Sequence, residues 1–227
     1  MKMKRIFSLY FLKNRFHDIL NIFLLKIFSL FRKRKLLVII GCGRSGTKYA
    51  SNIFKKSGFD VGHEGLGLNG ISSWCLVPYT DLRVWGPSWK EIKSFDNVVV
   101  HQVREPLKTI SSLQTFEEIS WDFIGKFINF NRRDSRTLRA MKYWYFWNKL
   151  AEKKAVITYK VEDFNSVFFK LCNMVRFNVD KKSAENVMAT EKKANRRKHV
   201  YLTWMDLKNE DAALTEKIKK LAKSYRY

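Results

Sequence analysis

Residues 36–48 read LLVIIGCGRSGTK, and this stretch decides the fold class. The continuous apolar run Leu36–Ile40 is typical of a strand that is buried on both faces of a parallel sheet. The segment Tyr49–Lys56, which follows the glycines, predicts a helix. A tight glycine turn between a buried strand and a helix is how a βα unit begins, so the stretch indicates an α/β domain.

Later segments repeat this alternation. Further strands are predicted at Phe59–Val61, Asn97–Val103 and Ala155–Tyr159. Further helices are predicted at Glu105–Phe116, Met141–Lys153, Phe164–Val175 and Asp211–Lys223. The glycine-rich residues 62–73 predict a loop. Strands that alternate with helices build a mainly parallel sheet, and we expect one such domain over residues 36–227, after a separate segment of residues 1–35.

The loop Gly41–Lys48 has the features of a phosphate-binding site. Its glycines let the backbone turn sharply and approach a ligand closely. Because the loop opens a helix, free N–H groups and the positive end of the helix dipole converge on one point. Arg44 and Lys48 add positive charge, and Ser45 and Thr47 add hydroxyl donors. A tight strand–helix turn without any ligand stays open as the alternative.

The nucleotide triphosphate motif Gly-x-x-x-x-Gly-Lys-Ser/Thr fits this loop only in part. Gly41 and Gly46 have the correct spacing, but Thr47 and Lys48 follow in the reverse order. The predicted strand 97–103 also runs into Arg104, where an acidic magnesium ligand would be expected. A P-loop-like kinase is therefore kept as an alternative function.

The dinucleotide motif Gly-x-Gly-x-x-Gly is met only formally, by Gly41, Gly43 and Gly46. Its acidic partner for the ribose should lie about 20 residues further on. Asp60 and Glu64 lie near that distance, so a dinucleotide site is kept as a weaker alternative.

The core Gly-Arg-Ser-Gly-Thr of this loop resembles the 5′-phosphosulfate loop of sulfotransferases that use 3′-phosphoadenosine 5′-phosphosulfate (PAPS), especially those of the carbohydrate type and small bacterial sulfotransferase-like proteins. The family has a second signature, in which a strand leads to Arg-x-Pro and a Ser follows eight residues after the Arg. Arg104-Glu105-Pro106 and Ser112 match it, with Ser111 as an adjacent candidate. The guanidinium of an Arg can donate two parallel hydrogen bonds to a phosphate, and a Ser two helical turns later can face the same ligand.

The resemblance covers about residues 36–227 and implies a PAPS-dependent sulfotransferase with an α/β, P-loop-type three-layer fold. It implies that Arg104 and Ser112 bind the 3′-phosphate. The 5′-phosphosulfate would be bound by the loop residues Cys42, Gly43, Arg44, Ser45, Gly46, Thr47 and Lys48. One departure from the cytosolic branch of the family is Arg44, which stands where that branch has Lys. The expected acceptor is a hydroxyl of a carbohydrate or glycolipid.

Transfer of a sulfuryl group to a hydroxyl needs a base and fixed positive charge. Arg44 and Lys48 are the candidates for the charge. Glu64 is the preferred base and His63 the second choice, because both follow a short strand that we expect beside the first one, at the edge where open α/β sheets bind ligands. Alternatively, Glu64 is a solvated loop acid or the partner of a nearby Arg. His101, in the middle of a strand, is expected to be a hydrogen-bonded core residue.

The net charge of +23 attracts polyanions in general, such as phosphate cofactors, nucleic acid, anionic lipid or acidic glycans. No RNA- or DNA-binding module can be recognised in the sequence, so nucleic acid is not the favoured partner. A non-enzymatic basic protein that binds nucleic acid or membrane is nevertheless kept as an alternative. Cys42, Cys75 and Cys172 have neither metal-ligand spacing nor an even number. We therefore expect no metal, no disulfide framework and a cytoplasmic location.

Residues 1–35 form a basic segment, with ten Lys and Arg residues against the single acid Asp18. The apolar stretch Ile19–Phe31 is short and is interrupted by Lys26, so a transmembrane anchor is not expected. As a helix, the stretch would place apolar residues opposite a narrow polar stripe. This pattern predicts a peripheral helix on an anionic membrane surface. An ordinary amphipathic helix packed on the domain is an equal alternative.

Overall fold

The fold is a three-layer α/β sandwich around a parallel sheet of five strands, in the order β2-β3-β1-β4-β5. The structure is a computed structural model that describes residues 18–27, 35–78, 87–131, 133–191 and 200–227. The strands are β1 (Leu36–Gly41), β2 (Val61–His63), β3 (Gly70–Ser72), β4 (Asn97–Val103) and β5 (Ile157–Lys160). The predicted fold class, a mainly parallel sheet flanked by helices, is confirmed.

The helices connect and cover these strands. They are α2 (Thr47–Lys56), α3 (Trp89–Ile92), α4 (Pro106–Leu113), α5 (Glu118–Ile124), α6 (Arg136–Glu152), α7 (Phe164–Met174), α8 (Lys181–Thr190), α9 (Trp204–Glu210) and α10 (Ala212–Ser224), with a 3₁₀ turn η1 (Val161–Asp163) after β5. Residues 18–27 are also helical. None of the described helices is long and apolar enough to cross a bilayer.

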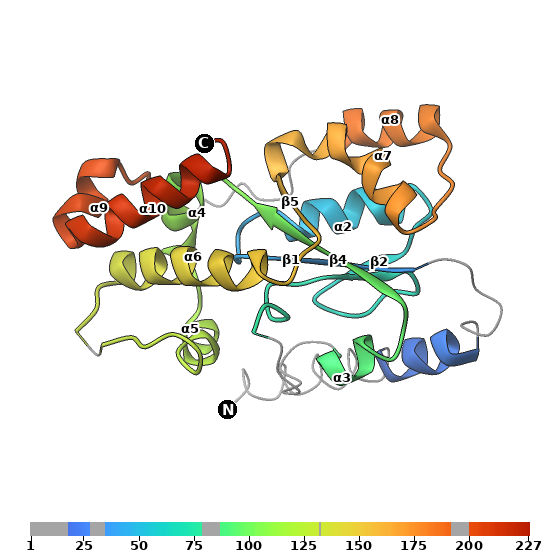
Figure 1. The fold of residues 1–227 in the computed structure, drawn as a ribbon, viewed down its shortest axis with the longest axis horizontal. Helices are drawn as coiled ribbons and strands as arrows, with labels where there is room; N and C mark the ends of the chain where they lie inside the picture. The colour runs from blue at the N-terminus through green and yellow to red at the C-terminus, as the bar shows by residue number, and fades with distance from the viewer. Residues whose placement is uncertain (1–17, 28–34, 79–86, 132, 192–199) are drawn as a thin grey trace, which may run out of the picture.

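Strand β1 is buried on both faces because helices pack against both sides of the sheet. Leu37 and Ile39 lie in a core with residues of α2, α7 and α8. Val38 and Ile40 lie in a second core with Leu25 and with residues of α3, α6 and α10. In Figure 1, α2, α7 and α8 lie on one side of the sheet, whereas α3 and the helix of residues 18–27 lie on the other. This two-sided burial explains why β1 is a continuous apolar run.

Two predictions about the sheet are wrong. The second strand was expected beside the first, but β3 lies between β1 and β2. Gly70–Ser72 was predicted to be part of a loop, since a three-residue strand beside glycines carries no periodic signal. Gly70 permits the pairing, because a Cβ there would collide with the backbone of Leu37. His63 and Glu64 therefore come from the edge strand, one position further from β1 than expected.

Parallel strands place their carboxyl ends at one edge of the sheet, and this edge carries the glycine loop after β1, Arg104 after β4 and Val161 after β5. Helices α4, α5, α6, α9 and α10 lie beyond the same edge (Figure 1). Ligands of open α/β sheets bind at this edge, so the candidate site is built there.

Candidate functional site

The loop between β1 and α2 has a backbone conformation suited to an anion. Arg44 and Gly46 are both left-handed, with φ of 67° and 92°. A Cβ on Gly46 would lie 2.7 Å from Val161 Cγ2, so only glycine fits there without movement. The first turn of α2 receives no side-chain cap from Gly46 and contains no acidic residue. Its N–H groups and the helix dipole therefore favour a negative ligand.

Side chains of the neighbouring strands fix the carbonyl groups of this loop. Gln102 Nε2 donates to the Ser45 carbonyl at 2.8 Å, and Ser72 Oγ donates to the Thr47 carbonyl at 2.9 Å. Because C=O and the next N–H point in opposite directions across a trans peptide, the N–H groups of Gly46 and Lys48 point away from these donors. Neither N–H makes a hydrogen bond to a described residue. The loop therefore presents donors on the side opposite the sheet.

Two further contacts hold the loop in place. Tyr159 Oη donates to Gln102 Oε1 at 2.8 Å, which fixes the amide that holds the Ser45 carbonyl. The Gly43 N–H donates to Tyr143 Oη at 2.9 Å, so this amide is already used within the protein. Ser45 Oγ, in contrast, is buried and has no hydrogen-bond partner among the described residues. A buried hydroxyl without a partner is costly, and a bound group that accepted its proton would remove that cost.

The second predicted phosphate motif lies directly against the loop. Arg104 Nη1 donates to the Arg44 carbonyl at 3.1 Å. The Arg44 guanidinium lies 5.0 Å from the centre of the Phe116 ring and donates through Nη2 to Thr115 Oγ1 at 3.2 Å. Thr115 Oγ1 in turn donates to the Ser112 carbonyl at 2.9 Å. Two motifs separated by about 60 residues in the sequence thus form one connected cluster, centred on Arg44.

The two adjacent serines of α4 differ in their hydrogen bonds. Ser111 Oγ accepts the N–H of Leu202 at 2.9 Å, so this hydroxyl holds the segment before α9. Ser112 is 7% exposed; its carbonyl accepts from Thr115 Oγ1, and no hydrogen bond of its own hydroxyl is found among the described residues. At the start of the same helix, the carboxylate of Glu105 accepts the N–H groups of Leu107 and Lys108 and caps α4. Ser112, rather than Ser111 or the helix terminus, is therefore available to a ligand.

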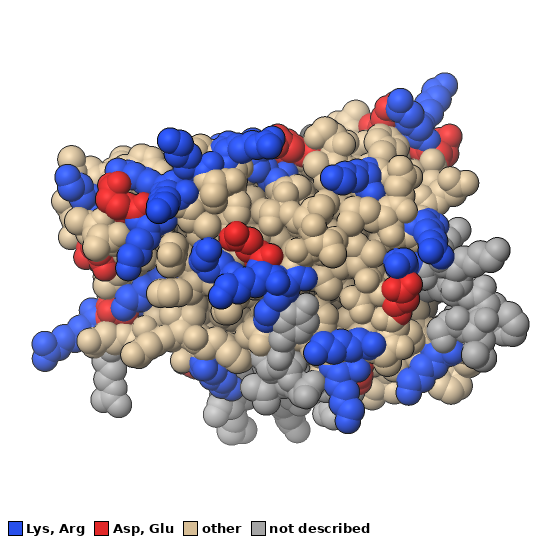
Figure 2. All heavy atoms as spheres, viewed as in Figure 1, with Lys and Arg blue, Asp and Glu red and all other residues tan. Residues whose placement is uncertain are grey.

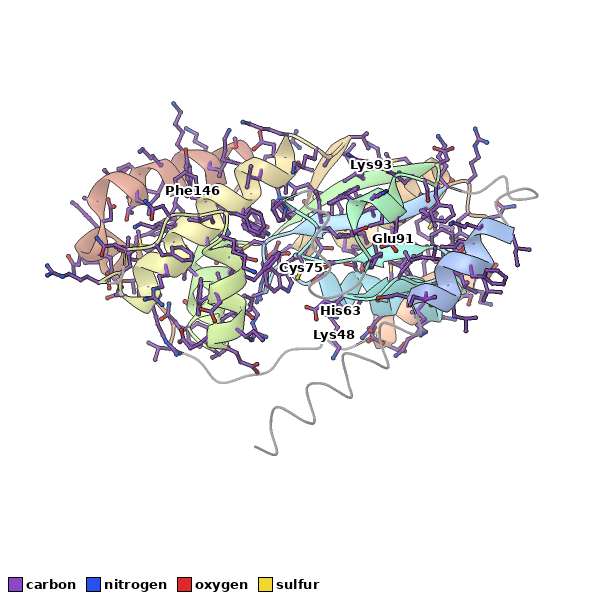
Figure 3. All side chains as sticks on the ribbon, turned by 90° about the horizontal axis from the view of Figure 1, so that it is seen from below. Lys48, His63, Cys75, Glu91, Lys93 and Phe146 are labelled. Carbon is purple, nitrogen blue, oxygen red and sulfur yellow. The ribbon has the colours of Figure 1, made fainter. Side chains whose placement is uncertain are left out.

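The candidate bases lie beside the loop, on the segment that follows β2. His63 Nε2 lies 3.4 Å from Thr47 Oγ1, and Figure 3 shows His63 and Lys48 close together at one edge of the molecule. Burial lowers the pKa of His63, nearby Lys48 lowers it further, and Glu64 opposes both effects. The imidazole is therefore neutral near pH 7 and can accept a proton.

Glu64 makes a different contact. Its Oε1 accepts the indole N–H of Trp74 at 3.0 Å. Its backbone is left-handed, with φ of 60°, which is uncommon for a residue with a side chain. Strained conformations of this kind concentrate at functional sites. Arg44 and Glu64, two of the three residues predicted to act in catalysis, both have it, and so do Arg176 and Arg226, which follow α7 and α10.

Two residues considered in the sequence, Cys42 and His101, have buried side chains that do not face a ligand. Cys42 is buried within the loop, and burial raises the pKa of its thiol well above the ordinary value, so any contact of Cys42 with a ligand is through its backbone. His101 is buried, with Nε2 3.0 Å from Asn148 Oδ1 and Nδ1 3.2 Å from Thr158 Oγ1. His101 is thus the hydrogen-bonded core residue that was predicted.

Sequence reasoning missed the residues that support the loop, namely Ser72, Gln102, Thr115, Tyr143 and Tyr159. The sequence did indicate a role for Gln102, since a polar amide inside an apolar strand must find a hydrogen-bond partner. The others come from elements that approach the loop only in the folded protein. In the described part of the chain, no three His, Cys, Asp or Glu side chains are grouped as a metal site would require.

No protein family model matches this chain, and no curated protein sequence is similar to it. Among solved structures, the chain is similar to the crystal structure of mouse sulfotransferase SULT7A1 complexed with PAP. The two chains are 12% identical, the match covers 81% of this chain and 75% of that chain, and the TM-score is 0.42. A likeness this distant shows neither the family nor the function of this chain.

Proposed function

We propose that this chain is a sulfotransferase that transfers a sulfuryl group from PAPS to a hydroxyl of a carbohydrate or glycolipid. The observation that carries the proposal is the contact between the glycine loop and Arg104, made through the Arg44 carbonyl. This contact connects the N-terminus of α2, which favours an anion, to the guanidinium of Arg104. Arg104 is a second cationic group, and the hydroxyl of Ser112 belongs to the same motif. PAPS has two separate anionic groups, the 5′-phosphosulfate and the 3′-phosphate, and such a site offers one donor set to each.

The residues present suit these two groups. The Gly46 and Lys48 N–H groups, the Ser45 and Thr47 hydroxyls and the Lys48 ammonium would hold the 5′-phosphosulfate. Arg104 and Ser112 would hold the 3′-phosphate. The buried Ser45 hydroxyl without a partner supports the first assignment. The Ser112 hydroxyl, which bonds to no described residue, supports the second. When bound, PAPS supplies an activated sulfuryl group with a good leaving group.

The residues beside the loop would accept the proton of the acceptor hydroxyl and stabilise the negative charge at the loop. We assign the base to His63, because its Nε2 lies beside the loop hydroxyl of Thr47 and its lowered pKa leaves it neutral. Glu64 would stabilise the protonated imidazole, and it stays the alternative base. Lys48 and the Arg44 guanidinium would stabilise negative charge at the loop, where the low dielectric of a partly buried site strengthens the interaction.

Two other functions are less well supported. A kinase of this fold class holds magnesium with an acidic residue at the end of a strand beside β1. Here β3 ends at Ser72 and is followed by Ser73, and β4 is followed by Arg104. A basic nucleic-acid-binding protein should gather its charge along one path. Figure 2 instead shows Lys and Arg side chains in several separate groups on the face in view.

The test is a calorimetric titration with 3′,5′-adenosine bisphosphate, 5′-AMP, and ATP with magnesium. We expect the bisphosphate to bind most tightly. Arg104→Ala should weaken it by about 10- to 100-fold, since a hydrogen bond to a charged group contributes about 1.5–3 kcal/mol. The control is Arg133→Ala, which removes the same charge from an exposed loop position before α6. A preference for ATP with magnesium, or equal losses in the two variants, would exclude the proposal.

A further inference from the structure

The helix of residues 18–27 packs on the domain through its polar side. Asp18 Oδ1 accepts the N–H of Leu66 at 2.7 Å, and Asn21 Nδ2 donates to the carbonyl of the same residue at 2.5 Å. Asp18 and Asn21 are almost fully buried, together with the apolar Leu25 one turn further on. A surface helix normally turns its apolar stripe toward the core and its polar face toward water. This helix instead buries Asp18 and Asn21 beside Leu25 and leaves several large apolar side chains exposed.

The consequence is an apolar stripe on the outside of the molecule. Ile19, Leu20, Phe23 and Ile27 are exposed by 50, 45, 59 and 46%. Their spacing of three and four residues places them on one side of the helix. Single exposed apolar residues are common, but a contiguous exposed group of large ones marks a binding surface. We refer to these four residues as the outer stripe.

The charge around the outer stripe indicates what covers it. Lys26 lies within the helix, and basic residues lie in the sequence on both sides, at Lys13 and Arg15 before it and in the run 32–35 after it. A partner that is apolar at the contact and negatively charged around it would match both the stripe and the basic sequence on either side of it. The boundary between headgroups and acyl chains in an anionic bilayer has both properties.

We propose that the outer stripe docks this protein onto an anionic membrane surface. The Leu66 hydrogen bonds then determine which part of the protein lies next to the membrane. Leu66 is two residues after Glu64, and a Cβ on Gly65 would lie 3.4 Å from Asp18 Oδ1. Docking therefore leaves only the helix, about 10 Å thick, between the segment of the candidate bases and the lipid surface. If the proposed sulfotransferase function holds, this placement favours an acceptor hydroxyl that is carried by a lipid.

The test is co-sedimentation of the full chain with vesicles of phosphatidylcholine, with and without phosphatidylglycerol. We expect binding only to the vesicles that contain phosphatidylglycerol, weakened by added salt. Phe23→Glu should lower the partition coefficient by about tenfold or more, because it removes an aromatic anchor and adds a repelled charge. The matched control is Phe146→Glu on α6, which replaces a phenylalanine that is 46% exposed and should bind like the wild type.

Thermal unfolding of both variants checks that they fold. Two results would overturn the proposal: failure of the wild-type chain to bind the anionic vesicles, and unchanged binding by Phe23→Glu. Loss of a dimer in Phe23→Glu, seen by sedimentation velocity without vesicles, would overturn it in favour of a second copy of the chain. Titration with 3′,5′-adenosine bisphosphate is independent of the stripe, so failure of the docking proposal and failure of the sulfotransferase proposal give different results.

Discussion

The neighbouring serines of α4 give a sharp test, because the same small change should have opposite effects at the two positions. Ser112→Ala removes a hydroxyl for which no hydrogen bond is found among the described residues, since the contact with Thr115 uses the Ser112 carbonyl. If that hydroxyl donates to the 3′-phosphate, its loss costs about 1.5–3 kcal/mol of binding, or an affinity lower by about 10- to 100-fold. Stability should change by no more than about 0.5 kcal/mol, as for a substitution that breaks no contact.

Ser111→Ala should behave in the reverse way. It removes the acceptor of the Leu202 N–H and leaves a partly buried donor unsatisfied, so we expect about 1–2 kcal/mol of lost stability and an almost unchanged affinity. Calorimetry with 3′,5′-adenosine bisphosphate gives the affinities, and urea unfolding gives the stabilities. The assignment is refuted if Ser112→Ala binds the bisphosphate as tightly as the wild type, or if both variants lose affinity equally.

Three further outcomes follow from the site and the core. Burial lowers the pKa of His101 to about 4, below about 6.5 when unfolded, so its contribution to stability is complete above pH 6.5 and is lost as the pH falls toward 4. The loss should total about 3 kcal/mol in urea unfolding, and a flatter profile is expected for His101→Gln. His63→Gln should lower kcat by about 10²- to 10⁴-fold and remove the acid limb of the kcat/KM profile, which in the wild type lies below the ordinary histidine pKa. Gly46→Ala should cost at least about 1 kcal/mol of stability and weaken bisphosphate binding, because φ is 92° and Val161 is in the way.

Each of these has a contradicting result. An unfolding profile of His101→Gln as steep as that of the wild type would show that another group titrates. An unchanged acid limb in His63→Gln would move the base to Glu64, which Glu64→Gln then tests directly. Wild-type stability of Gly46→Ala would mean that the loop relaxes around the new methyl group.

The main elements of the fold could be predicted from the sequence because they have strong local signals. The apolar runs of β1 and β4 are buried on both faces, and the helix after Pro106 has its expected first turn. Elements stabilised mainly by their neighbours were missed. Strand β3 has three residues, and α3, α5, α8 and α9 lie in stretches without a clear apolar period. Their conformation depends on tertiary packing, which overrides weak local preference.

In the candidate site, too, some features could be predicted from the sequence and others could not. The loop, Arg104 and Ser112 could be proposed because their spacing follows a known pattern along the chain. Their contact through Arg44 could not, because it depends on the register that sets Gly41 beside Gln102 in the sheet. The orientation of the helix 18–27 was also beyond the sequence, which gives its stripes but not the side that packs inward. The two Leu66 hydrogen bonds decide that question.

The position of β1 at the centre of a parallel sheet also has a consequence for synthesis of the chain. Both neighbours of β1 come later in the sequence, at β3 and β4, so its backbone groups have no strand partner when it leaves the ribosome. An uncharged run of five apolar residues is then an aggregation hazard. The run of Lys and Arg at residues 32–35 stands directly before Leu36 and would act as a gatekeeper. Neutralising those charges should therefore lower the yield of correctly folded protein even where the mature fold is unchanged.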